Sequence, residues 1–202
     1  MNLDNTADKY NRIDKASSSI TVNAGNTMTG TQANQLAVGQ RNTITTNPAD
    51  MKITNNGTIT LSGATSTGLA AETGTVLNTG TVSVNGAKST GLFGADGAII
   101  TNDTTGAINI GTEGAGILAQ KDLDGTARTL GLITVENKGN ITANTGGTKV
   151  IGIYADNTGG PVTSTVSHTS GTIDLSRAPA SLGIYTKDLD LTSAGNITAT
   201  GT

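Results

Sequence analysis

The sequence contains neither cysteine nor tryptophan, and it is poor in aromatic and charged residues. Aromatic side chains make up 2% of the 202 residues, and Asp, Glu, Lys and Arg together make up 13%. The absence of cysteine excludes a disulfide framework. Because large aromatic side chains normally contribute much of the area buried in a thick core, their scarcity favours many short strands built from small and β-branched residues.

Charge and hydropathy exclude two classes of partner. The formal net charge is −3, whereas nucleic-acid binding requires a basic surface. The chain has no polybasic run, and no apolar stretch approaches the length of about 18 residues that a membrane-spanning helix needs. We therefore expect no nucleic-acid partner and no direct insertion of this chain into a membrane.

What the sequence does contain is an internal repeat, which is plainest in the adjacent segments 53–75 and 76–98. The first motif is a glycine with Ile or Val two positions after it. It recurs at 57–61, 80–84, 106–110, 139–143, 171–175 and 195–199. A second motif, glycine followed by Leu or Ile, recurs at 68–71, 91–94, 116–119, 152–155 and 183–186. A third short apolar group begins at Ile53, Val76, Val135, Val166 and Leu191. Each repeat therefore contains three short strands separated by turn residues.

The repeat predicts an all-β fold, the parallel β-helix. Alternation with a period of two places Ile59 and Leu61 on one face of a strand and Thr60 on the other. No apolar stripe with a period of 3.6 residues is sustained, so we expect few helices. Three strands in a repeat of 23 residues, the interval from Gly57 to Gly80, are typical of a solenoid whose stacked rungs share one core. Propellers and sandwiches fit less well, because a propeller blade needs four strands and a longer period.

Glycine and asparagine recur at one corner of the predicted rung. The first glycine of each repeat marks a position where the chain needs either a positive φ or a close approach of two backbones. Asn55, Asn78 and Asn137 each lie two residues before such a glycine. We expect them in the same turns, because asparagine tolerates the left-handed conformation and bonds its own backbone.

The repeat is irregular towards both ends of the chain. Residues 1–50 match it poorly and are predicted to form an irregular N-terminal segment or cap with one degenerate rung near Gly25, whereas 51–202 are predicted to form the rungs, truncated at the C-terminus. Longer intervals after Gly106 predict insertions at 121–134 and 156–166, and such insertions often carry binding function. Neither a signal peptide nor a complete last repeat is present, which is expected of a segment of a longer protein.

The combined pattern I/V-x-N-x-G-T-I-x-V-x-G and S-T-G-[IL]-[YFL]-A resembles the passenger region of bacterial type V autotransporters. The resemblance is strongest to the long, repeat-rich adhesins of fusobacterial type (the RadD-like family), and it is carried by residues 53–71, 76–94, 99–119, 135–155, 166–186 and 191–199. It implies a right-handed β-helix stalk that is displayed outside the cell and anchored by a C-terminal membrane domain. The N-terminal quarter and the two insertions depart from the family pattern.

One position of the second motif gathers nearly all of the aromatic residues. It follows the predicted inward Leu or Ile and is occupied in successive repeats by Ala70, Phe93, Leu118, Tyr154 and Tyr185. Alternation predicts that this column points outward. Phe93, Leu118, Tyr154 and Tyr185 are therefore our candidate partner-contact surface. The alternative is a stacking ladder that only stabilises the solenoid.

Catalytic and metal-binding chemistry is poorly supported. Residues 121–124 and 187–190 both read Lys-Asp-Leu-Asp, and an extended chain would point the two aspartates of each segment the same way. A solvated turn explains them better than a Ca²⁺ site, which needs six or more oxygen ligands. His168 is the only histidine, which excludes most zinc sites and Ser-His-Asp chemistry, and we expect it at the surface. A threonine array for ice binding is also excluded, because the Thr-x-Thr pattern at 58–60 does not persist.

The sequence therefore predicts a non-enzymatic protein with no cofactor and no metal. Together with the resemblance, it implies a segment of an adhesin on the bacterial cell surface, which attaches to a protein or glycan of host cells or of other bacteria. The alternative is a structural spacer in the stalk, and a polysaccharide-active β-helix enzyme is a more distant one.

Overall fold

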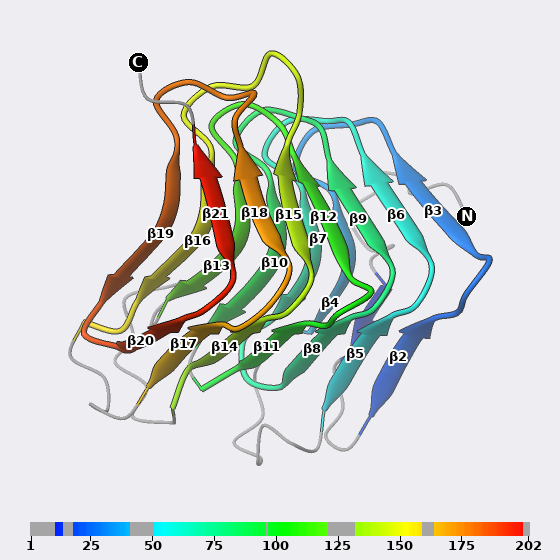
Figure 1. Cartoon of the computed structure of the whole chain (residues 1–202). Helices are drawn as coiled ribbons and strands as arrows, with labels where there is room; N and C mark the ends of the chain where they lie inside the picture. The colour runs from blue at the N-terminus through cyan, green and yellow to red at the C-terminus, as the bar shows by residue number, and fades with distance from the viewer. Residues whose placement is uncertain are drawn as a thin grey trace.

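The structure is a computed structural model that describes residues 11–13, 18–40, 51–95, 97–120, 132–158 and 164–199. Within these ranges the chain forms short strands and no helix, and the strands make three parallel sheets (Figure 1). Sheet 1 contains, in spatial order, β2 (Ser19–Val22), β5 (Lys52–Asn55), β8 (Thr75–Asn78), β11 (Ile99–Asn102), β14 (Thr134–Asn137), β17 (Thr165–His168) and β20 (Asp190–Ser193).

The other two sheets have the same number of strands. Sheet 2 contains β3 (Thr27–Gly30), β6 (Thr58–Leu61), β9 (Thr81–Val84), β12 (Ala107–Ile110), β15 (Asn140–Ala143), β18 (Thr172–Leu175) and β21 (Asn196–Ala199). Sheet 3 contains β1 (Asn11–Ile13), β4 (Leu36–Gln40), β7 (Thr67–Ala71), β10 (Thr90–Ala95), β13 (Ala115–Gln120), β16 (Ile151–Asp156) and β19 (Leu182–Lys187).

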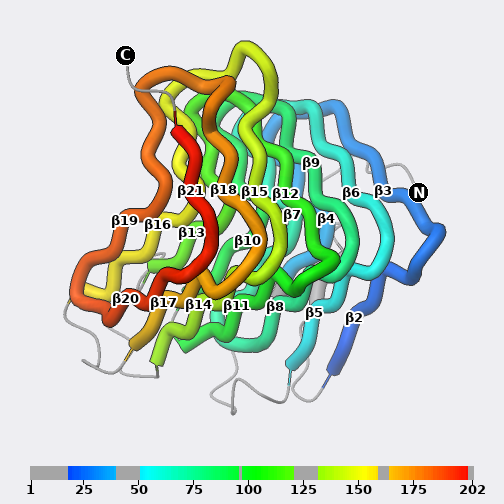
Figure 2. The backbone as a smooth tube through the Cα atoms, in the orientation of Figure 1, coloured from blue at the N-terminus to red at the C-terminus, as the bar shows by residue number. Residues whose placement is uncertain are grey.

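The chain visits the three sheets in constant order and advances by one rung at each turn, from blue to red along the solenoid (Figure 2). Each strand from β4 to β18 pairs in parallel with the equivalent strands of the rungs before and after it. The protein is thus a right-handed parallel β-helix with three short strands per rung, as the sequence predicts.

The core is a stack of inward-facing apolar side chains from all three sheets. In the central rungs these residues are at most 1% exposed: Ile53, Val76, Ile100, Val135 and Val166 in sheet 1, Ile59, Val82, Ile108, Ile141 and Ile173 in sheet 2, and Leu69, Leu92, Ile117 and Ile153 in sheet 3. Each lies in register with its equivalents in the neighbouring rungs. Val82 is buried and Ser83 is half-buried on the other side of β9, which confirms the predicted assignment of faces.

A complete rung precedes residue 50. Strands β2, β3 and β4 pair in register with β5, β6 and β7, so the predicted degenerate rung near Gly25 is regular in its strand pairing. Residues 1–10, 14–17 and 41–50, on which the prediction of an irregular segment or cap mainly rests, lie outside the described residues.

The two predicted insertions fall at one corner of the solenoid, between sheets 3 and 1. Residues 121–131 and 159–163, which form most of them, lie outside the described residues. The register is the same on either side, because Gln120 at the end of β13 is opposite Asp156 at the end of β16, and Thr134 at the start of β14 is opposite Thr165. The insertions therefore lengthen the connections without shifting the rungs.

The corner glycines between sheets 1 and 2 are required chiefly by close backbone contact. A Cβ atom on Gly80 would lie 2.1 Å from the carbonyl oxygen of Gly57, and one on Gly139 would lie 2.2 Å from that of Gly106. Of the glycines that open the first motif, only Gly171 has a positive φ.

Six of the seven described non-glycine residues with a positive φ lie at a different corner, between sheets 2 and 3: Asn34, Thr65, Lys88, Glu113, Lys149 and Ala180, with φ between 54° and 60°. The first five of these residues bond to the following rung in the same way. Each donates its backbone amide to the carbonyl oxygen of the residue that precedes the next left-handed residue, as Asn34 does to Ala64, which precedes Thr65. Asn55, Asn78 and Asn137 do not adopt the left-handed conformation, whereas the expected bond to the nearby backbone is present at Asn55, whose Oδ1 atom accepts from the amide of Gly57. The three asparagines end strands of sheet 1 and point into the solenoid.

Candidate interaction surface

The predicted outward column exists as a continuous row on sheet 3. Phe93 is opposite Ala70 and Leu118, Leu118 is opposite Tyr154, and Tyr154 is opposite Tyr185. The row therefore crosses five adjacent strands in register. We call it the outward column.

A second row, of glycines, sets the direction of the outward column. A Cβ atom on Gly116 would lie 2.6 Å from the carbonyl oxygen of Gly152 and 2.7 Å from the Cγ2 atom of Ile141 in the core. Glycine at this position allows the strand of sheet 3 to begin tightly against the core strand of sheet 2. The next residue, Ile117, is also buried, and Leu118 then falls on the outer side.

Exposure varies along the outward column. Leu118, Tyr154 and Tyr185 are half-buried. Phe93 differs from the expectation, because its side chain is only 8% exposed although its register places it on the outer side. The accessible part of the column therefore begins at Leu118, and Phe93 offers little area to a partner.

The two tyrosines form a stacked pair. Their ring centroids are 4.9 Å apart and their planes differ by 11°. The two residues belong to neighbouring rungs, so the faces of the rings are directed along the axis of the solenoid. A partner that approaches sheet 3 from the side meets ring edges and phenolic hydroxyls.

Polar side chains lie beside the tyrosine pair. In register, Asp156 is opposite Gln120 on one side and Lys187 on the other. The hydroxyl of Tyr154 lies 3.5 Å from Oδ2 of Asp156. Burial and the nearby negative charge of Asp156 raise the pKa of Tyr154, which keeps the phenol protonated and able to donate.

The carboxylate of Asp156 remains charged beside these rings. Burial alone would raise the pKa of Asp156, but hydrogen bonds from the hydroxyl and the amide of Thr158, together with the positive charge of Lys187, lower it below its ordinary value. The tyrosine pair is thus bordered by an anion, a cation and the Gln120 amide, which is a combination suited to hydrogen bonding with a polar partner.

A ladder of buried asparagines runs along the corner between sheets 1 and 2. The Nδ2 atom of each donates to the Oδ1 atom of the next at 2.8 Å, and all four side chains are 0% exposed: Asn55, Asn78, Asn102 and Asn137. Asn102 lies four residues before Gly106, two residues further than the spacing of the other three asparagines predicts. The sequence signal that could have identified it is its place at the end of an Ile-Ile-Thr strand.

His168 terminates the asparagine ladder, and the expectation that it lies at the surface is wrong. Its side chain is 0% exposed. Its Nδ1 atom lies 3.0 Å from Nδ2 of Asn137, and its Nε2 atom lies 3.1 Å from the carbonyl oxygen of Asn196. Because Nδ2 of Asn137 donates to His168, Nδ1 of the imidazole accepts. Its Nε2–H then donates to the carbonyl oxygen of Asn196. The residue occupies the asparagine position of its rung, which explains its burial.

The Lys-Asp-Leu-Asp segment that the structure describes, residues 187–190, does not have the extended backbone that the sequence suggested. Asp188 is exposed and has a φ of 57°, so the chain is not extended there, and the expected common direction of Asp188 and Asp190 loses its basis. The equivalent segment 121–124 lies outside the described residues. Among the residues that the structure describes, no three His, Cys, Asp or Glu side chains gather into a possible metal site, and no helix is long and apolar enough to cross a membrane.

Comparison with models of protein families, with curated proteins and with solved structures gives no match for this chain.

Proposed function

We propose that this chain is a segment of the passenger stalk of a bacterial autotransporter adhesin, and that it contacts its partner through the exposed end of the outward column. The partner is a protein or glycan on the surface of a host cell or of another bacterium, and the chain acts outside the cell. The observation that supports this most is the tyrosine pair of sheet 3, because it places the densest aromatic surface of the solenoid beside Asp156 and Lys187.

The geometry favours a hydrogen-bonded contact over flat stacking. Two of the four faces of the tyrosine rings are occupied by the stack itself, so hydroxyls and ring edges are what the side of the solenoid offers. The tyrosine hydroxyls can donate, the carboxylate of Asp156 accepts, and the side-chain nitrogen of Lys187 donates. Sugar hydroxyls and peptide amides both match this set, and the partner classes named above remain the two to be tested.

A binding measurement with matched variants tests the proposal. Fluorescently labelled chain is titrated onto epithelial cells and onto partner bacteria, together with a Tyr154→Ala/Tyr185→Ala variant. We expect saturable binding that the double substitution weakens at least tenfold. The matched control is Thr54→Ala/Leu77→Ala, an in-register outward pair on sheet 1, which should leave binding unchanged. Circular dichroism of all three proteins confirms that the β structure is retained.

The second candidate function is that of a spacer, and the regularity of the solenoid favours it. Every sheet continues in register through seven strands, a construction that transmits length and stiffness without a dedicated site. Absence of saturable binding by the unsubstituted chain to either cell type would favour the spacer, and equal binding by the tyrosine variant and its control would reject the outward column. We do not propose a polysaccharide-active enzyme, because the backbone at Asp188 is not extended and the reason to expect its carboxylate on the same side as that of Asp190 is lost.

A further inference from the structure

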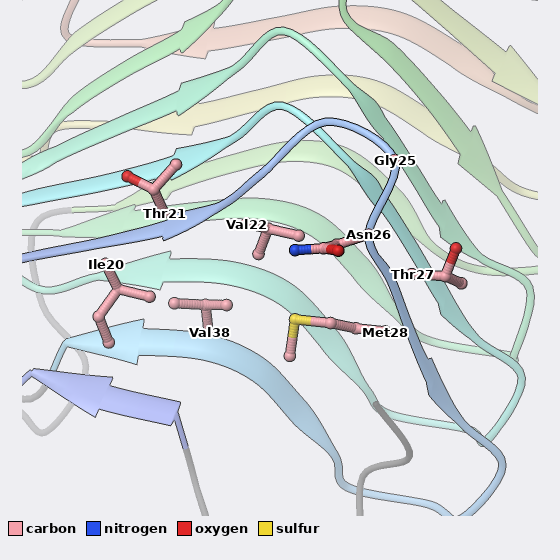
Figure 3. Close-up of a pocket in the computed structure, with 8 residues that line it drawn as sticks. All are labelled: Ile20, Thr21, Val22, Gly25, Asn26, Thr27, Met28 and Val38. Atoms are coloured by element: carbon pink, nitrogen blue, oxygen red, sulfur yellow. The ribbon is translucent and has the colours of Figure 1, made fainter.

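The asparagine ladder has two chemically different ends. Its column in sheet 1 runs in register from Val22 through the four asparagines to His168. Val22 lines a cavity, and Figure 3 shows its side chain converging there with those of Ile20 and Met28. An aliphatic side chain neither donates nor accepts a hydrogen bond, so nothing in the Val22 side chain can respond to a change in the ladder. The other end is an imidazole, which can gain a proton.

Backbone groups fix the direction of the ladder at the Asn55 end. The Oδ1 atom of Asn55 accepts from the amide of Gly57 at 3.2 Å, and its Nδ2 atom donates to the carbonyl oxygen of Thr81 at 3.3 Å. Rotation of the side-chain amide by half a turn would set its NH2 group against the N–H of Gly57 and its oxygen against that of Thr81. Every amide of the ladder therefore donates towards the imidazole.

His168 can accept from the ladder only while its Nδ1 atom carries no proton. Nδ1 lies 3.0 Å from Nδ2 of Asn137, and Nε2 lies 3.1 Å from the carbonyl oxygen of Asn196. Because a carbonyl oxygen only accepts, the single proton of the neutral ring is on Nε2. A second proton would be on Nδ1 and would point at the NH2 group of Asn137, so that two donors would face one another.

The surroundings of Nδ1 accommodate a second proton poorly. The carbonyl oxygen of Asn137 lies 3.4 Å from Nδ1, which is long for a hydrogen bond, and this oxygen already accepts from the amide of Thr169 at 3.1 Å. Reversal of the whole ladder would restore an acceptor, but Gly57 and Thr81 oppose it at the other end. Protonation therefore removes the hydrogen bond between Asn137 and His168.

The charged residues on the described strands around the ring lie at outward or distant positions. On β14, Glu136 faces outward and pairs with Lys138, whose Nζ atom is 2.8 Å from its Oε1 atom. On β18, Asp174 also faces outward, and on β20, Asp190 lies three residues before the position opposite His168. Strands β17 and β21 contain no Asp, Glu, Lys or Arg. Because the imidazole is 0% exposed, a charge on it would be buried without a paired carboxylate among these strands.

We propose that His168 is an acid-sensitive link in the solenoid. Protonation breaks its bond to Asn137 and loosens the β14–β16 rung from the β17–β19 rung. The same two rungs carry Tyr154 and Tyr185, so acid also loosens the strands that support the tyrosine pair. The link itself does not depend on the adhesive function proposed above.

The composition of the chain allows the response of this one residue to be measured. Histidine is the side-chain type that ordinarily changes charge between pH 5 and pH 8, and the chain has one histidine and no cysteine. Aspartate and glutamate change charge at about pH 4. A difference in stability between pH 7 and pH 5 therefore reports chiefly on His168.

Urea unfolding at pH 7 and at pH 5 tests the proposal, with His168→Asn as the matched control. Asparagine keeps an acceptor for Asn137 and has no proton to gain. Because the unfolded chain takes up the proton without breaking a bond, acid favours unfolding, and one proton limits the change to about a hundredfold over this interval. We expect the equilibrium constant of unfolding to rise about tenfold for the unsubstituted chain and less than about twofold for His168→Asn. An equal pH dependence of the two proteins would overturn the proposal.

Nitrogen-15 NMR of the unsubstituted chain gives a second readout that needs no variant. At pH 7, Nδ1 of His168 should have the chemical shift of a nitrogen without a proton, and Nε2 that of a nitrogen with one. As the pH is lowered and the ring gains its second proton, the side-chain amide resonances of Asn137 should move, whereas those of Asn55 at the far end should not. A proton on Nδ1 at pH 7 would overturn the proposal, as would Asn137 resonances that stay unchanged while the ring is protonated.

Discussion

Removal of one side chain from the centre of the asparagine ladder should destabilise the whole solenoid. In Asn78→Ala, the Oδ1 atom that accepts from Asn55 and the Nδ2 atom that donates to Asn102 are lost, both at 2.8 Å and both fully buried. A buried hydrogen bond contributes about 1 kcal/mol net, and a buried partner left unsatisfied costs about 1–3 kcal/mol. Asn55 keeps a second acceptor, the carbonyl oxygen of Thr81, whereas Oδ1 of Asn102 loses its one donor among the described residues.

We therefore expect Asn78→Ala to lower the free energy of unfolding by about 3 kcal/mol. The assay is urea denaturation followed by far-UV circular dichroism. Asn56→Ala is the matched control, because Asn56 is exposed and its side chain only accepts from the hydroxyl of Thr79. Its cost should be about 0.5 kcal/mol or less.

A double-mutant cycle isolates the contribution of the ladder itself. Asn78→Ala/Asn102→Ala removes both partners of one rung-to-rung bond, so no orphaned oxygen remains between them. The double variant should cost less than the sum of its two single variants by about 1 kcal/mol or more. Strict additivity, or an effect of Asn78→Ala no larger than that of Asn56→Ala, would refute the view that the ladder holds the rungs together.

Three further predictions follow from the burial of single residues. Val82→Asp should cost about 4 kcal/mol or more in a urea melt because it buries an unpaired charge, whereas Ser83→Asp, on the outer side of the same strand, should cost about 0.5 kcal/mol; equal costs would mean that the faces are reversed. His168→Leu should cost about 2 kcal/mol more than His168→Asn in the same assay, because only asparagine keeps an acceptor for Asn137; equal values would contradict the ladder's direction. The lowered pKa of Asp156 means that its stabilisation is present above about pH 4 and is lost as the pH falls further, so Asp156→Asn should flatten that part of the stability–pH curve.

The regular parts of the fold were predictable because each is set by a local pattern. Alternation fixes which face of a strand is buried, so Ile59 and Val82 could be placed in the core from the sequence. The same alternation placed Tyr154 and Tyr185 in one outward row, and the constant second motif kept them in register through a long insertion. These inferences needed only the repeat.

The polar interior was not predictable in the same way. Asparagine is common in turns, so a sequence rule assigns Asn78 to a solvated corner, and only the stacking of rungs shows that its amide finds a partner above and below. His168 was misplaced for the same reason, since its type suggests the surface while its position in the repeat determines its burial. The cover that leaves Phe93 only 8% exposed is likewise set by tertiary structure and has no local sequence signal.

Every proposal above depends on three sheets in register, and amide hydrogen exchange tests that register most directly. The account predicts slow exchange that recurs three times per rung from β5 to β18, because each of these strands is paired on both sides. Exchange should be faster in β20 and β21, which are sheet edges within the described residues. Fast exchange throughout β8 to β15, or protection confined to one continuous segment, would contradict the solenoid and the outward column with it.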